Sequence, residues 1–249
     1  MLKIVAIGGG EIGQPGTKIE IENIDKEIIR LSGKKRPRLL FIPTASGDSE
    51  SYYNVVKKYF GKRLGCQTDV IYLIKKKYSK NDLENKVFNS DIIYVGGGNT
   101  LFLLKQWRKA GLDQIILRAA KKGIVLSGIS AGSICWFKYG LSDSRKYRNQ
   151  KANLIRVSGL NLIKALHTPH YHFEPKRIKG LKKITRKTTG VAIAIDNCCA
   201  LEVVGDQYRI LKTRASAYAY KVYWKNNKYF VKKIKESKEF APLINILTK

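Results

Sequence analysis

The chain has 249 residues, 44% of them hydrophobic, and is long enough to bury a substantial core as a single α/β domain over residues 1–249. Its 48 lysines and arginines outnumber 19 aspartates and glutamates, which gives a formal net charge of +29. The basic residues stand in scattered short groups without interleaved aromatic residues, and this distribution favours a solvated lysine-rich surface over a dedicated nucleic-acid site.

The N-terminus carries an apolar run, Met1 to Ile7, that meets three glycines at once and is too brief for a signal peptide. No later stretch approaches the length of a membrane span. The four cysteines include no Cys-x-x-Cys pair, and no histidine stands at a metal-ligand spacing from them. We therefore expect a cytoplasmic protein with buried thiols and neither a disulfide framework nor a metal site. The cysteines are Cys66, Cys135, Cys198 and Cys199.

The first half of the chain alternates strand and helix patterns, which predicts a mostly parallel central sheet with helices on both faces. Such sheets carry their sites beyond the carboxyl ends of the strands. The predicted strands are Lys3 to Ile7, Arg38 to Ile42, Thr68 to Leu73, Ile92 to Val95 and Ile124 to Ser127. The helical patterns are Glu22 to Leu31, Ser51 to Leu64, Asp82 to Val87, and Thr100 to Ala120 with a break at Gly111.

Small or polar residues follow four of these strands, and the parallel arrangement brings them to one edge of the sheet. One of the loops, Gly96 to Thr100, lacks both the P-loop lysine and the spacing of a dinucleotide fingerprint. Its glycines allow a backbone N–H, from Gly97 or Gly98, to approach a ligand closely as an oxyanion donor. Asn99 or Thr100 can cap the following helix. A simple tight turn is the alternative interpretation.

The fifth strand runs into Gly-x-Ser-x-Gly, the pattern of a nucleophile elbow, with Ser130 at its centre. A sharp strand-to-helix turn would hold Ser130 in a strained conformation with its hydroxyl exposed. The N–H of Ala131 would lie at the start of the next helix, where an unpaired donor can bind an oxyanion. We interpret Ile134, Trp136 and Phe137 as one face of that helix. An ordinary loop is the alternative.

The second half is richer in strand patterns, and we expect an antiparallel C-terminal extension of the sheet there. A helix that opens at Pro175 and runs to about Thr188 precedes most of these strands. Gly205-Asp206 and Asn226-Asn227 are predicted hairpin turns. The strands are Val191 to Ile195, Ala200 to Val204, Tyr208 to Leu211, Ala217 to Trp224 and Tyr229 to Ile234.

A serine nucleophile needs a base within hydrogen-bond reach, and the only histidines are His167, His170 and His172. One of them must be the base if Ser130 is a nucleophile. The alternatives are structural imidazoles or a metal cluster, since His170 and His172 would share one face of a strand. For the carboxylate that orients the base, the residues leave three alternatives open. These are Asp143, Glu174 and Asp196.

With these motifs in their order and spacing, nearly the whole chain resembles the peptidase E family of serine peptidases. The wider clan includes cyanophycinase and has a class I glutamine-amidotransferase-like fold, which the resemblance implies for this chain. The motifs that carry the resemblance are Ala6 to Gly10, Ile42 to Ser46, Val95 to Thr100, Gly128 to Ser133 and Thr168 to Tyr171.

The resemblance implies a catalytic triad of Ser130 as nucleophile, His170 as general base and Asp143 as the acidic partner. It implies Gly98 and Ala131 as oxyanion donors. In the cyanophycinase branch the acidic partner lies instead in an Asp-Glu pair near a late strand. That pair reads Asp196-Asn197 here, a departure that favours Asp143.

Peptidase E cleaves dipeptides with an N-terminal aspartate and so needs a cation near the substrate's side-chain carboxylate. A gapped match puts Arg177 close to the family's arginine, and Asn99 is a second candidate substrate-binding residue. A structural arginine on a helix surface is the alternative for Arg177. His172 stands where other members of the family vary, and this affects the expected specificity.

These observations lead to the hypothesis of a cofactor-free serine peptidase that acts on short peptides with an acidic N-terminal residue through an acyl-enzyme on Ser130. We expect a monomer or a homodimer with no membrane partner and no specific nucleic-acid partner. An esterase or amidase with another substrate is one alternative. A non-catalytic relative that binds nucleic acid through its positive surface is another.

Overall fold

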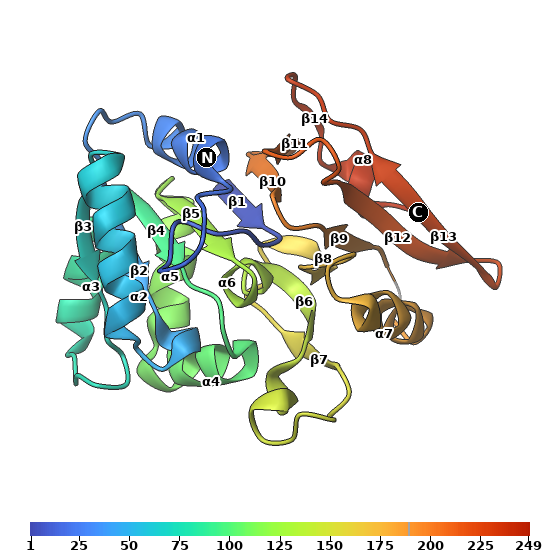
Figure 1. The fold of residues 1–249 in the computed structure, drawn as a ribbon, viewed down its shortest axis with the longest axis horizontal. Helices are drawn as coiled ribbons and strands as arrows, with labels where there is room; N and C mark the ends of the chain where they lie inside the picture. The colour runs from blue at the N-terminus through green and yellow to red at the C-terminus, as the bar shows by residue number, and fades with distance from the viewer. Residues whose placement is uncertain (189) are drawn as a thin grey trace.

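This computed structural model describes residues 1–188 and 190–249, and its larger sheet has eight strands that come from both halves of the chain (Figure 1). The strand order is β14-β11-β10-β1-β5-β4-β2-β3. From β1 to β3 along this order every pairing is parallel, as the alternating pattern predicts. The strands are β1 (Lys3–Ile7), β2 (Arg38–Ile42), β3 (Gln67–Val70), β4 (Ile92–Val95), β5 (Val125–Ile129), β10 (Cys199–Val204), β11 (Gln207–Lys212) and β14 (Ala241–Pro242).

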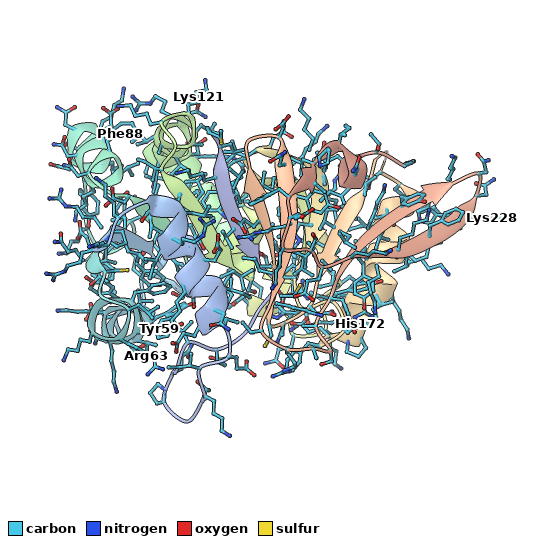
Figure 2. The ribbon with its side chains drawn as sticks, turned by 90° about the horizontal axis from the view of Figure 1, so that it is seen from above. Tyr59, Arg63, Phe88, Lys121, His172 and Lys228 are labelled. Atoms are coloured by element: carbon cyan, nitrogen blue, oxygen red, sulfur yellow. The ribbon has the colours of Figure 1, made fainter. Side chains whose placement is uncertain are left out.

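Helices cover both faces of the parallel part, and for this reason its central strands are apolar on both sides. Figure 2 places Tyr59 and Arg63 on one side of the strands, and Phe88 and Lys121 on the other. Gly111, with a φ of 70°, ends one helix and starts the next, at the predicted break. The elements are α1 (Glu22–Ser32), the short helix η1 (Thr44–Ser46), α2 (Glu50–Val56), the π-helical turns η2 (Lys57–Arg63), α3 (Lys80–Phe88), α4 (Thr100–Ala110) and α5 (Leu112–Lys121).

A second sheet of six strands lies beside the first, with the order β13-β12-β9-β8-β6-β7 (Figure 1). Helix α7 packs against β6 and β12 of this sheet. Its strands are β6 (Phe137–Ser142), β7 (Ile155–Ser158), β8 (Ile163–Thr168), β9 (Ala192–Ile195), β12 (Ala219–Lys225) and β13 (Lys228–Ile234). The other elements are α6 (Ala131–Ile134), η3 (Ser144–Tyr147), α7 (Pro175–Arg186) and α8 (Ile244–Leu247).

The expected α/β class with a mostly parallel sheet and helices on both faces is confirmed, but the antiparallel extension is divided between the two sheets. The β10–β11 hairpin extends the first sheet through β1. The β12–β13 hairpin instead pairs with β9 in the second sheet. Both predicted turns form, and Asn226 and Asn227 have the positive φ values of a type I′ turn. Turn residues and alternation predict a hairpin, whereas the sheet it joins depends on distant partners.

The helix after Ser130 is much shorter than its apolar pattern suggests. It ends at Ile134, and Phe137, expected on its face, begins β6 instead. Phe137, Tyr139 and Gly140 of this strand pair with β8 in the second sheet. Short apolar runs of this kind fit a buried strand as well as a helix, and the long-range pairing decides between them. The third strand also ends early, at Val70 instead of Leu73.

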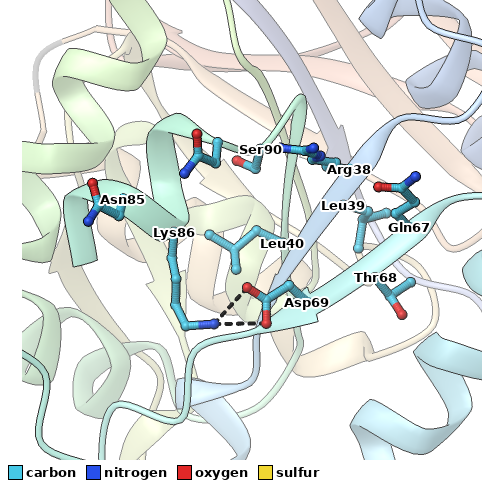
Figure 3. A pocket seen from close by; sticks show the side chains of 10 residues that line it. Arg38, Leu39, Leu40, Gln67, Thr68, Asp69, Asn85, Lys86 and Ser90 are labelled. Carbon is cyan, nitrogen blue, oxygen red and sulfur yellow. Dashed lines mark hydrogen bonds and ion pairs between the residues drawn. The ribbon is translucent and has the colours of Figure 1, made fainter. Parts of the chain in front are cut away.

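All four cysteines are buried and unbridged, as expected from their sequence context. Across the described residues, no helix combines the length and the apolar character that crossing a bilayer requires. A cavity of about 340 Å³ opens between β2, β3 and α3, where Lys86 forms an ion pair with Asp69 (Figure 3). Its lining includes none of the predicted site residues.

Candidate active site

Ser130 stands at the sharp turn between β5 and α6, where the two sheets meet (Figure 1). Its φ of 55° and ψ of −113° are unfavourable for a residue with a side chain, at a cost of about 1–3 kcal/mol. Its N–H donates to the Ile7 carbonyl at 3.1 Å, which ties the turn to β1. Side chains at Gly128 or Gly132 would overlap neighbouring backbone atoms. The turn therefore has the tight packing and the strain of a nucleophile elbow.

His170 lies in the loop between β8 and α7, and its ring reaches Ser130. The distance from His170 Nε2 to Ser130 Oγ is 2.8 Å, so the serine hydroxyl can donate to the imidazole. His170 also has a positive φ, 53°, and its N–H donates to the Gly8 carbonyl at 3.1 Å. Because β8 ends at Thr168, His170 and His172 do not share a strand face as the sequence suggested.

Asn197 accepts the hydrogen bond from the other nitrogen of this ring, and the sequence did not single it out for that role. Its Oδ1 lies 2.6 Å from His170 Nδ1. A methyl group on Gly9 would lie 2.5 Å from His170 Nδ1 and would overlap Asn197 Oδ1 as well, so only glycine fits under this pair. The signal available in the sequence was the Asp196-Asn197 pair, at the place where the cyanophycinase branch has Asp-Glu.

The surroundings of His170 favour its neutral form. Burial of the imidazole, together with the positive charge of Arg177, lowers the pKa of His170 below its ordinary value of 6.5. The hydrogen bond to Asn197 and the charges of Glu174 and Asp143 act in the opposite direction but do not outweigh the burial. A neutral imidazole at physiological pH can accept a proton from Ser130.

The glycine-rich loop after β4 passes beside Ser130. A Cβ on Gly97 would lie 3.5 Å from the Ser130 Cβ. The next residue, Gly98, packs so closely on Ala45 that no side chain fits there. Within residues 1–188 and 190–249, the N–H groups of Gly98 and Ala131 donate to no protein acceptor. Two unpaired donors are thus available close to the serine.

None of the three carboxylates considered from the sequence contacts His170. Asp143 pairs with Lys146 at 3.2 Å and with Arg177 at 3.8 Å, and Asn197 occupies the place beside Nδ1 that we expected Asp143 to fill. Burial alone would raise the pKa of Asp143, but these two cations hold it below its ordinary value.

The other two carboxylates have partners of their own. Glu174 pairs with Arg177 at 3.0 Å. Asp196 accepts hydrogen bonds from the ring and the N–H of His172 and from the N–H of Tyr218. The expectation of an acidic partner fails because the turn after β9 directs Asn197, and not Asp196, toward the His170 ring.

Arg177 and Asn99, the two candidate substrate-binding residues, are both engaged within the protein. Arg177 is only 3% exposed, and its guanidinium donates to Glu174 and to the Leu141 carbonyl. Asn99 accepts from the Phe102 N–H and so caps α4. The structure therefore favours a structural role for Arg177, inside the protein and not on a helix surface, and a helix-capping role for Asn99.

Two exposed cations adjoin this network instead. Lys146 and Lys176 are neighbours, and their side chains are 36% and 42% exposed. Partial burial and the nearby Lys146 ammonium lower the pKa of Lys176. Lys146 contacts Asp143, whose charge acts on His170. Lys176 also lies 3.8 Å from the Glu174 carboxylate. Unlike the buried Arg177, the two ammonium groups are partly exposed and side by side, so they can still attract an anion from solution.

A second serine–histidine pair, Ser133 and His167, lies in the protein interior. Ser133 Oγ is 2.9 Å from His167 Nε2, and His167 Nδ1 donates to the Ile193 carbonyl at 2.9 Å. Both side chains are fully buried, and burial lowers the pKa of His167 to about 3. No three His, Cys, Asp or Glu side chains of the described chain gather as metal ligands would.

The chain is similar in sequence to known peptidases. The profile of Peptidase family S51 matches residues 4–211. An uncharacterized peptidase of Bacillus subtilis, YgaJ, is 37% identical over 226 residues, which cover 89% of this chain and 92% of the relative. A Peptidase E of Nostoc is 29% identical over 150 residues, 59% of this chain and 57% of the relative.

The fold is also that of a solved peptidase structure. A peptidase crystal structure from an acI-B1 Actinobacterium superposes with a TM-score of 0.71 over 97% of both chains, at 20% identity. The resemblance noted from the sequence motifs is thereby confirmed, and the chain belongs to peptidase family S51.

Proposed function

We propose that the protein is a serine peptidase that hydrolyses short peptides, with preference for an acidic N-terminal residue, through an acyl-enzyme on Ser130. The observation that carries the proposal is the 2.8 Å contact between Ser130 Oγ and His170 Nε2, made at a strained elbow beside two unpaired N–H groups. Membership of family S51 supports the same chemistry.

In the acylation step Ser130 Oγ attacks the carbonyl carbon of the substrate and passes its proton to His170 Nε2. The N–H groups of Gly98 and Ala131 donate to the oxyanion of the tetrahedral intermediate. When the intermediate collapses, the carbon–nitrogen bond breaks and His170 returns the proton to the leaving amine. The first product leaves with a new N-terminus, and the acyl group remains on Ser130.

In the deacylation step water attacks the ester carbonyl while His170 accepts a proton from it. The same two N–H groups stabilise the second tetrahedral intermediate, and the returning proton restores the Ser130 hydroxyl. Every proton transfer uses one ring nitrogen. The other nitrogen must therefore keep its proton throughout the cycle.

The preference for an acidic residue is supported by the cations next to Asp143. Since Arg177 is buried and paired, we assign the recognition of the substrate carboxylate to Lys146 and Lys176. A charged hydrogen bond of this kind contributes about 1.5 kcal/mol or more. We expect Lys176→Met to lower kcat/KM for an Asp-containing dipeptide about tenfold, whereas Lys179→Met, one turn further along α7, leaves it unchanged. Equal effects of the two substitutions would contradict the assignment.

The proposed nucleophile is tested by covalent labelling. Diisopropyl phosphorofluoridate reacts as Oγ forms a bond to phosphorus, fluoride leaves and the proton passes to His170. Mass spectrometry should find one adduct, on Ser130. Ser130→Ala should abolish it, and His170→Ala should slow it strongly. An adduct elsewhere, or none on the folded protein, would refute the catalytic assignment.

The substrate class is tested by comparing the turnover of Asp-containing dipeptides with that of dipeptides bearing neutral N-terminal residues and with that of simple esters. We expect the Asp-containing dipeptides to have the highest kcat/KM. A higher value for the esters would favour the esterase alternative and leave the labelling result intact.

A further inference from the structure

The partner of the catalytic imidazole carries no charge, and this has consequences for the chemistry of the site. His170 Nδ1 lies 2.6 Å from the Oδ1 of Asn197. The carboxylates of the neighbourhood are tied to other groups. Asp143 and Glu174 pair with Arg177, and Asp196 pairs with His172. Only an amide oxygen is left to accept the Nδ1 proton.

The backbone around Asn197 holds that oxygen in place. On one side, the Asp196 carboxylate accepts from the N–H groups of His172 and Tyr218. On the other side, the Cys198 N–H donates to the Gly9 carbonyl at 2.8 Å, and Cys198 has a φ of 61°. Gly9 itself packs directly against both members of the His170–Asn197 pair. The backbone is thus held on both sides of Asn197, and Gly9 packs against the amide oxygen that faces His170.

We propose that Asn197 is the positioning residue of the active site, and that its neutral amide replaces the carboxylate of a Ser-His-Asp triad. The inference rests on the proposed function of Ser130 and His170. An amide oxygen accepts only, so it selects the tautomer with the proton on Nδ1 and leaves Nε2 free for the Ser130 proton. The opposite amide orientation would present an N–H group and select the wrong tautomer.

The neutral partner also changes how the site titrates. A carboxylate would stabilise the imidazolium by charge, whereas an amide contributes a hydrogen bond of about half that strength. An amide does not titrate, so the partner is the same at every pH. The charged groups that act on His170 are Arg177, Glu174 and Asp143, and the neutral His167 and Ser130 adjoin it. We expect the acid side of the rate profile to follow a single protonation.

The decisive variant is Asn197→Asp, which keeps the shape and adds a charge. Imidazole ¹⁵N NMR on the whole protein should show His170 with its proton on Nδ1 in the wild type. In Asn197→Asp the pKa of His170 should rise by one unit or more, as expected beside a new carboxylate. Asn226→Asp, the same change at an exposed hairpin turn, is the control and should leave His170 as it is.

A second variant and a second measurement test the same role of Asn197 independently of the NMR experiment. Asn197→Ala removes the acceptor, and the rate of Ser130 phosphorylation by diisopropyl phosphorofluoridate should fall about 10²-fold. The reaction of Asn197→Asp should need a higher pH than that of the wild type. Circular dichroism verifies that each variant is folded.

The outcomes separate this inference from the proposed function. A wild-type His170 with its proton on Nε2, or an unchanged pKa in folded Asn197→Asp, would overturn the role of Asn197 even if Ser130 is labelled. Absence of labelling with the expected NMR result would instead remove the proposed function and leave the pairing of His170 with Asn197 established.

Discussion

Two serine–histidine pairs lie close together in this protein, and they differ in almost everything except the hydrogen bond. In one, Ser130 Oγ is 2.8 Å from His170 Nε2, and in the other Ser133 Oγ is 2.9 Å from His167 Nε2. In both, Nδ1 faces an oxygen, that of Asn197 or that of the Ile193 carbonyl. Distance and pairing alone would describe both as candidate nucleophiles.

The difference lies in the backbone and in access to solvent. Ser130 occupies a strained turn and is partly exposed, whereas Ser133 is an ordinary residue of α6 and is fully buried. His167 stacks on Phe137 and links α6 to β8 and β9. The same pair of side chains therefore serves as a candidate catalyst where a substrate can reach it and as a structural link where none can.

The largest effect should separate the two serines. We expect Ser130→Ala to lower kcat by about 10⁶-fold, as loss of a serine nucleophile does in other peptidases. Ser133→Ala should change kcat less than tenfold, because that hydroxyl meets no substrate. The measurement is steady-state hydrolysis of an Asp-containing dipeptide. Comparable losses of kcat in both variants would contradict the distinction between a catalytic Ser130 and a structural Ser133.

The second effect concerns stability, and here the buried pair should be more sensitive to substitution than the exposed pair. His167→Ala removes a fully buried ring together with its hydrogen bonds to Ser133 Oγ and to the Ile193 carbonyl. The Ser133 hydroxyl keeps the Ser130 carbonyl as a partner at 2.7 Å, so the loss of the packed ring dominates and should cost about 3–5 kcal/mol of unfolding free energy. His170→Ala, at a strained and partly exposed position, should cost far less. Urea unfolding followed by circular dichroism compares the two. A greater loss in His170→Ala would contradict the structural role of His167.

The third effect tests whether the activity depends on the exact position of the His170 ring relative to Ser130. Gly9→Ala should push the His170 ring away from Ser130 and lower kcat about 10²-fold, the scale expected for a displacement of about 1 Å. Gly61→Ala in η2 is the matched control, since the added methyl group would meet its nearest neighbours only at ordinary contact distance, 3.6 Å or more. Equal activity of the two variants would show that the pair tolerates displacement.

The smallest effect is a difference in pH dependence. His170 must be neutral to act as a base, and burial lowers its pKa, so activity should persist somewhat below pH 6.5 before it falls. The folded pKa of His167, about 3, lies below its unfolded value of 6.5, so the unfolded chain binds the extra proton between them. Stability should therefore fall as the pH drops through that window. Rate profiles and acid unfolding curves test both, and a loss of activity already above pH 6.5 would disagree with the burial of His170.

Much of the sheet and of the elbow could be predicted from local pattern. The observed ranges of β1, β2 and β4 are identical to the predicted ones, and Gly111 divides α4 from α5 as expected. Apolar runs between glycines leave few alternatives for a buried parallel strand. The pairing of β12 and β13 with the second sheet could not be predicted in this way, because it depends on which distant strand offers a free edge.

The candidate active site shows the same division between features that local pattern predicts and features that depend on long-range pairing. Local spacing alone determined the Gly-x-Ser-x-Gly turn at Ser130 and the short segment that holds every histidine, since each is written in adjacent residues. Tertiary structure decided that Asn197 faces His170, that Arg177 is buried among carboxylates, and that only one of two serine–histidine pairs is accessible. Those outcomes follow from strand pairing and packing between segments far apart in the chain, which no local pattern specifies.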